Sequence, residues 1–145
     1  MRLIVIAVGR VKDRPLRAAL DEYLGRVRRY VACDEVEIPD GPLPKVSQAL
    51  TRAATGANVI ALDVGGRALP SEAFATSLER WGSRGKGVVA FLIGGADGLP
   101  PEVSAAADDR WSLSTLTFPH RLARLVLVEQ LYRAMTILRG EPYGH

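Results

Sequence analysis

Residues 87–98 read Gly-Val-Val-Ala-Phe-Leu-Ile-Gly-Gly-Ala-Asp-Gly, an unbroken apolar run that passes directly into a glycine-rich loop. Apolar runs without alternation are typical of strands covered on both faces, as in a parallel sheet. Glycines after such a strand let the backbone approach a ligand closely. A dinucleotide-binding fold would carry its glycines after the first strand, where Gly9 stands without a G-x-G-x-x-G pattern. The stretch therefore predicts a parallel α/β sheet with a ligand-binding loop at residues 94–98.

The rest of the chain alternates short apolar runs with helical patterns. Strands are expected at about 3–8, 35–38, 58–63, 87–93 and 110–113. Helices are expected at about 16–30, 46–53, 71–81, 102–107 and 119–139. This alternation, without linker or repeat, predicts one α/β domain over residues 1–145 with a parallel sheet.

Composition and charge indicate the compartment of the protein and the kind of partner that it could bind. The single cysteine, Cys33, cannot form an internal disulfide, and the apolar run at 3–8 is too short for a membrane span and lacks a cleavage site. We therefore expect a cytoplasmic protein. The net charge is only +3, but the first thirty residues carry eight basic against three acidic side chains. From charge alone this bias favours a solvated helix face, although a local basic face can also attract phosphates.

The last predicted helix is apolar on nearly every side. A helix of this kind needs cover all round, and a domain this small has little with which to enclose it. We therefore expect a homodimer with this helix at the interface. The residues that carry the pattern are Leu122, Leu125, Val126, Leu127, Val128, Leu131, Ala134, Met135, Ile137 and Leu138.

Three loops follow predicted strands and should converge at one edge of the sheet: residues 62–66, 94–98 and 113–120. Their apolar side chains and free backbone groups suit a flat, neutral purine ring. No Cys, His or acidic cluster has metal-ligand spacing, so no metal is expected. No P-loop and no Ser-His-Asp arrangement is apparent, which disfavours nucleotide-phosphate and hydrolase chemistry.

Several ordered motifs resemble one family along the whole chain. Residues 92–99 fit L-I-G-G-x-x-G-L, residues 111–120 fit W-S-L-S-x-x-T-x-P-H, and residues 129–134 fit E-Q-L-Y-R-A. The sequence is thus similar to the RlmH family of SPOUT methyltransferases. The resemblance implies an α/β-knot fold with a C-terminal trefoil knot and an obligate homodimer. It also implies S-adenosyl-L-methionine (SAM) as methyl donor, bound by Leu62, Gly94, Gly95, Leu113, Ser114, Thr115, Leu116, Thr117 and Phe118.

The implied substrate is N3 of a pseudouridine in 23S rRNA of the assembled ribosome. Candidates for accepting the N3 proton are His120, Tyr143 and His145, although His120 could instead bind backbone or phosphate and Tyr143 could stack on the base. Phosphate contacts are expected from Arg10, Arg121 and Arg124, of which the last two could instead pair with acids across the dimer. The family tail commonly reads Pro-Tyr-His and then Arg or Lys, whereas this chain ends Pro-Tyr-Gly-His at 142–145.

Two other functions fit the same residues. A SPOUT methyltransferase could act on a tRNA or on another rRNA base, because fold alone does not fix the substrate. An inactive RNA-binding assembly factor would keep the fold and lose SAM binding. The intact loop at 94–98 and the motif match over the full length favour the RlmH-type activity.

Overall fold

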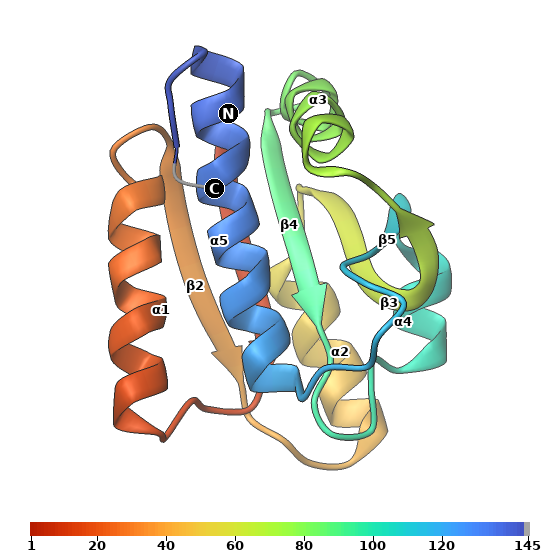
Figure 1. Ribbon diagram of the computed structural model, residues 1–145. Coiled ribbons are helices and arrows are strands. Elements are labelled where there is room, and N and C mark those ends of the chain that lie inside the picture. Colours follow the sequence, from red (N-terminus) through yellow and green to blue (C-terminus); the bar gives the residue numbers. More distant parts are fainter. Residues whose placement is uncertain (144–145) are drawn as a thin grey trace.

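Ten helices and strands alternate along the chain, and the computed structural model describes residues 1–143 (Figure 1). The five strands are β1 (Arg2–Val8), β2 (Ala32–Ile38), β3 (Asn58–Ala68), β4 (Val88–Ile93) and β5 (Asp109–Ser112). The five helices are α1 (Arg14–Val27), α2 (Leu43–Ala53), α3 (Ser71–Gly82), α4 (Pro101–Ala106) and α5 (His120–Arg139).

The strands form one sheet in the order β2-β1-β4-β3-β5, and every neighbouring pair is parallel. The predicted parallel α/β architecture is therefore confirmed. Helices α1, α3 and α5 cover one face of the sheet, and α2 and α4 cover the other (Figure 1). All five strands consequently end at the same edge, where α1, α2 and α5 begin.

The core divides into two clusters because side chains alternate along each strand. Leu3, Val5 and Ala7 of β1 point toward α1 and α5, in one cluster with Val89, Phe91 and Ile93 of β4. Ile6 and Val8 point toward α2, with Ala90 and Leu92. Burial on both faces explains why these strands are uniformly apolar in sequence.

Several element boundaries differ from the sequence prediction, among them the starts of β2 at Ala32 and of α2 at Leu43, each three residues earlier than expected. Two further differences have a clear local cause. Helix α1 begins at Arg14 and not near Leu16, because Asp13 caps it by accepting the Leu16 N–H at 3.0 Å and Pro15 fits the first turn. Strand β3 continues to Ala68, beyond the expected end at Asp63. Its pairing with β5 is interrupted between Leu62 and Arg67, so residues 63–66 bulge away from the ladder at the carboxyl edge.

Helix α5 packs between α1 and α3 on the sheet, and its outer side is left open (Figure 1). Leu127, Val128 and Leu131 are fully buried, whereas Leu122 and Ile137 are 40% and 36% exposed. The all-round apolar pattern is thus only partly covered within one chain. Among residues 1–143, no helix combines the length and the apolarity that crossing a membrane requires. The trefoil knot and the dimer stay predictions.

Candidate functional site

A pocket of about 690 Å³ opens at the carboxyl edge of the sheet, between the ends of β3, β4 and β5. Its volume is in the range of small-molecule sites. The three loops that were expected to converge do so here, and the first residue of α5, His120, closes one side. The lining comprises Leu62, Asp63, Val64, Ile93, Gly94, Gly95, Ala96, Gly98, Leu99, Ser112, Leu113, Ser114, Leu116, Thr117, Phe118, Pro119, His120 and Ala123.

The structure therefore brings together every residue that the resemblance assigned to SAM except Thr115, which is exposed and does not line the pocket. Thr115 lies in the loop between β5 and α5, and its neighbours Ser114 and Leu116 both reach the pocket. The apolar side chains of Leu62, Leu113 and Phe118 give the pocket walls suited to an aromatic ring.

Two glycines of the loop at 94–98 leave little or no room for a side chain. A Cβ on Gly94 would overlap the backbone of Gly98 and Leu99, lying 2.7 Å from the Gly98 carbonyl oxygen. A Cβ on Gly95 would lie 3.2 Å from Cγ1 of Val8. Gly98 has φ +77 and donates its N–H to the Gly95 carbonyl at 3.0 Å, which closes the turn. Bare backbone therefore forms the pocket wall at Gly94 and Gly95.

The loop between β5 and α5 is held by its own serines. Ser112 Oγ donates to the Ser114 carbonyl at 2.8 Å, and Ser114 Oγ accepts the Leu116 N–H at 2.9 Å. Leu116 is 68% exposed at the pocket although it is a large apolar residue. An exposed leucine beside an apolar pocket is suited to contact with a bound ligand or a partner surface.

Asp63 is a pocket residue that sequence reasoning did not single out. Its Oδ1 accepts the Gly65 N–H at 2.9 Å, and its Oδ2 accepts a hydrogen bond from Ser104 Oγ at 3.2 Å. The carboxylate thus stands oriented at the pocket wall, where it can accept hydrogen bonds from ligand hydroxyl or ammonium groups. Its position directly after Leu62, at the end of an apolar run, was the available signal.

His120 lies at the junction of the pocket and the loop that links β1 to α1. A Cβ on Gly9 would stand 3.7 Å from Nε2 of His120, so the ring packs against the Gly9 backbone. Arg10 and Arg121, the sequence neighbours of these two residues, are both exposed. Two of the three arginines predicted to bind RNA are therefore available to a phosphate on this side of the pocket.

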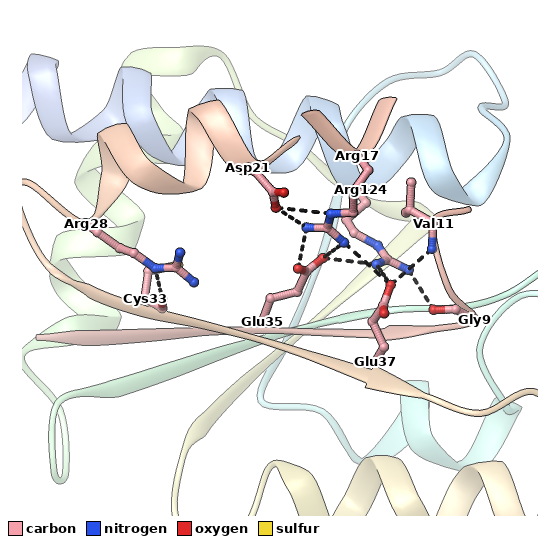
Figure 2. A network of polar contacts seen from close by, with 9 residues as sticks. All are labelled: Gly9, Val11, Arg17, Asp21, Arg28, Cys33, Glu35, Glu37 and Arg124. Atoms are coloured by element: carbon pink, nitrogen blue, oxygen red, sulfur yellow. Dashed lines mark hydrogen bonds and ion pairs between the residues drawn. The ribbon is translucent and has the colours of Figure 1, made fainter. Parts of the chain in front are cut away.

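Arg124 is not available, and here the sequence prediction was wrong. Its side chain is 1% exposed and lies inside the protein (Figure 2). Its Nη1 donates to Glu37 Oε2 at 2.6 Å and to Glu35 Oε2 at 3.0 Å, and its Nη2 donates to the Gly9 carbonyl at 3.0 Å. The acids that pair with it belong to the same chain and not to a partner.

Arg17 of α1 completes this buried network, since it donates to Glu35 at 2.6 Å and lies 3.7 Å from Glu37 (Figure 2). Burial alone would raise the pKa of the Glu37 carboxyl. The hydrogen bonds from Arg124 and the Val11 N–H, together with the charges of Arg124 and Arg17, outweigh burial and lower that pKa. Glu37 is therefore ionised at neutral pH.

Tyr143 lies far from the pocket of its own chain. Its hydroxyl donates to Glu129 Oε2 at 2.9 Å, its ring packs edge-on against Tyr132, and Arg133 stacks on it 4.5 Å from the ring centroid. Burial first, and then the neighbouring Tyr23 and Glu129, raise the pKa of this hydroxyl. Glu129, which accepts this hydrogen bond, lies nine residues after His120, about 14 Å along α5 at 1.5 Å per residue, and Tyr143 does not line the pocket. His145 lies outside the described residues.

Comparison with known proteins identifies the class. The fold resembles a probable methyltransferase from Bordetella pertussis (TM-score 0.63, 15% identity, 92% of this chain and 96% of that one). It also resembles a probable methylase family protein from Haemophilus influenzae (TM-score 0.61, 10% identity, 99% and 70%). At these identities the likeness concerns the fold alone. A family model described as "Predicted SPOUT methyltransferase" matches residues 1–145, so the chain belongs to the SPOUT methyltransferase family.

Curated relatives from several bacteria narrow the comparison to one kind of SPOUT protein, because they share the name ribosomal RNA large subunit methyltransferase H. The relative from Sorangium cellulosum is 81% identical over 145 residues, which cover 100% of both chains. The relative from Anaeromyxobacter dehalogenans is 49% identical, and that from Hyphomonas neptunium is 46% identical. Each of these two alignments covers 99% of this chain. They cover 99% of the Anaeromyxobacter relative and 98% of the Hyphomonas relative. Within residues 1–143, no group of three or more His, Cys, Asp or Glu side chains is placed to hold a metal ion.

Proposed function

We propose that this protein transfers a methyl group from SAM to N3 of a pseudouridine in 23S rRNA of the assembled ribosome. The observation that carries the proposal is the pocket at the carboxyl edge. Eight of the nine residues that the RlmH resemblance assigns to SAM line it, and a relative 81% identical over the whole chain is named for large-subunit rRNA methylation. The proposal includes a cytoplasmic location, because the substrate is the ribosome, and the single thiol supports this.

The pocket suits SAM in shape and chemistry. Leu62, Leu113 and Phe118 offer apolar walls for the adenine ring, and the bare backbone at Gly94 and Gly95 lets backbone groups approach it. SAM supplies, when bound, an electrophilic methyl group on a sulfonium, which is transferred by in-line displacement. The protein's work is to hold donor and base in line and to accept one proton.

His120 is the residue that we propose to accept the N3 proton, because it combines a titratable ring with a place in the pocket lining. Replacement by Gln should lower kcat by about 10²-fold or more while the Kd for SAM changes little. If His120 only binds a phosphate, the same substitution raises KM for ribosomes and leaves kcat unchanged.

We further propose that the protein works as a homodimer in which α5 lies in the interface. The open outer side of α5, with Leu122 and Ile137 exposed, supports this. A catalytic or base-stacking Tyr143 then has to come from the second chain, since its hydroxyl is held at Glu129, about 14 Å along α5 from His120, and Tyr143 does not line the pocket of its own chain. Mixing inactive His120→Gln and Tyr143→Ala proteins, with exchange of subunits, should restore activity if Tyr143 acts across the interface. No recovery despite proven exchange would contradict that arrangement.

The decisive test is methyl transfer from isotopically labelled SAM to ribosomes from a strain that lacks this protein, with the label mapped by mass spectrometry. Label on N3 of one pseudouridine of 23S rRNA is the expected result. Label on another rRNA or tRNA base would keep the reaction and change the substrate. SAM binding without label on any RNA would contradict the proposal, and absence of SAM binding would favour an RNA-binding assembly factor.

A further inference from the structure

Three exposed cations stand on the loop that leaves β1 and on the first residue of α1. Arg10, Lys12 and Arg14 are exposed, and none of them forms an ion pair with an acid among residues 1–143. The one acid between them, Asp13, is engaged as the cap of α1. Further along α1 the pattern changes, because Arg17 and Arg26 are each ion-paired.

This loop adjoins the pocket. Gly9 packs against His120, and Arg121, the next residue on α5, is exposed. A base that reaches His120 carries a phosphate on either side of its sugar. Those phosphates would therefore fall near the loop and near Arg121.

The conformation of the loop is fixed from inside the protein. Arg124 donates to the Gly9 carbonyl at 3.0 Å, and its ion-pair partner Glu37 accepts the Val11 N–H at 3.1 Å (Figure 2). The backbone is thus held on both sides of Arg10 by the two members of one ion pair, in which Arg124 is buried and Glu37 is half-buried. A buried ion pair contributes little net stability, because desolvation offsets the attraction. What this pair does provide is a single loop geometry.

We propose that residues 9–14 form a phosphate-binding rim for the RNA substrate. Arg10, Lys12 and Arg14 contact backbone phosphates, and Arg124 and Glu37 are positioning residues that hold the rim beside the pocket. The inference rests on the proposed function and extends it to the surface that recognises the RNA. A rim ordered before binding loses less conformational entropy when the RNA docks.

The first test replaces two rim cations, in the variant Lys12→Gln/Arg14→Gln. The matched control is Lys86→Gln/Arg80→Gln, which removes the same charge from exposed positions at the opposite edge of the sheet. We expect the rim variant to raise KM for ribosomes about tenfold, to leave kcat and the Kd for SAM unchanged, and to reduce the salt dependence of KM by about one or two in logarithmic slope. Equal behaviour of rim and control variants would overturn the proposal.

The second test concerns the positioning pair. Glu37→Gln removes the nearer of the two carboxylates that neutralise the buried Arg124 and leaves it with Glu35 alone. Arg124→Met/Glu37→Leu removes both charges of the pair, and Glu35 keeps its ion pair with Arg17. Both variants should exchange the Val11 amide faster and raise KM for ribosomes, with the Kd for SAM unchanged. A folded double variant with the KM and salt slope of the wild type would show that the pair is structural only.

Binding of large ribosomal subunits without SAM separates this inference from the proposed reaction. If the wild type transfers no methyl group, the proposed function fails, and the salt slope of binding still tests the rim. Weaker binding of the rim variant to naked 23S rRNA as well as to subunits supports phosphate contacts. A loss seen only with intact subunits would overturn them and indicate an acidic ribosomal protein as the partner of this surface.

Discussion

Gly9 meets His120 so closely that a Cβ on the glycine would lie 3.7 Å from the histidine Nε2. That distance is ordinary van der Waals contact, so space alone would admit alanine. The backbone does not, because Gly9 has φ +95, a conformation that residues with a Cβ rarely adopt. The loop beside the pocket thus depends on the glycine for its conformation rather than for room.

Gly9→Ala should accordingly lower the free energy of unfolding by roughly 1–2 kcal/mol and displace the loop from His120. We expect methyl transfer to fall further than SAM binding, since the loop carries Arg10 and not the donor contacts. Urea denaturation and single-turnover kinetics measure the two effects. The control is Gly25→Ala inside α1, where φ is ordinary and no atom lies within 4 Å of the added Cβ. It should stabilise by about 0.5–1 kcal/mol.

Gly94→Ala tests the wall of the pocket. A Cβ there would overlap the backbone of Gly98 and Leu99, and backbone cannot move aside as a side chain can. The loop at 94–98 must shift, and the Kd for SAM should rise by at least tenfold in calorimetric titration. The fold itself should survive, because the loop is at the surface. Wild-type affinity for SAM in a folded Gly94→Ala protein would show that this wall does not contact the donor.

Acid should weaken the contacts of Asp109 at the start of β5. Burial alone would raise the pKa of its carboxyl, but hydrogen bonds from Arg67, Trp111 Nε1 and the Arg110 N–H outweigh burial and lower it. A carboxyl whose pKa is lower in the folded than in the unfolded state adds stability above its unfolded pKa, near 3.8, and loses it as the pH falls through the folded value.

Asp109→Asn should therefore cost about 1 kcal/mol at pH 7 and flatten the fall in stability below pH 4. The measurement is the free energy of unfolding in urea between pH 2 and pH 7. Asp34→Asn serves as control, since its ion pair with Arg2 is half exposed and should be worth less than about 0.5 kcal/mol. Equal pH profiles for the Asp109 variant and the wild type would contradict the assignment.

The sequence predicted the pocket better than the polar network behind it. Uniform apolar runs that end in glycine or small polar residues specify parallel strands, and parallel strands end at one edge, so residues 62, 94 and 113 had to converge. The burial of Arg124 had no such local signal, because an arginine one turn into a helix usually marks a solvated face. Its partners Glu35 and Glu37 do alternate with Cys33 on one face of β2, which is the only hint that α5 meets acids there.

Cys33 stands on that same face of β2 and gives a prediction at alkaline pH. Its side chain is 3% exposed, and burial raises the pKa of the thiol to about 11, against a smaller lowering by Arg28. The fold thus favours the neutral thiol. The stability that this thiol contributes is complete below its unfolded pKa near 9 and is lost as the pH rises toward 11. Cys33→Ala removes the titrating group, so its free energy of unfolding should decline less than that of the wild type between pH 9 and pH 11, by up to about 2 kcal/mol. Urea titrations across that range measure the difference between the two proteins. Because both contain the same tyrosines, the effect of tyrosine titration cancels in that difference. Iodoacetamide should label native Cys33 slowly at pH 8 and rapidly after unfolding; parallel stability curves together with fast native labelling would show that the thiol is accessible and ionisable in the folded protein.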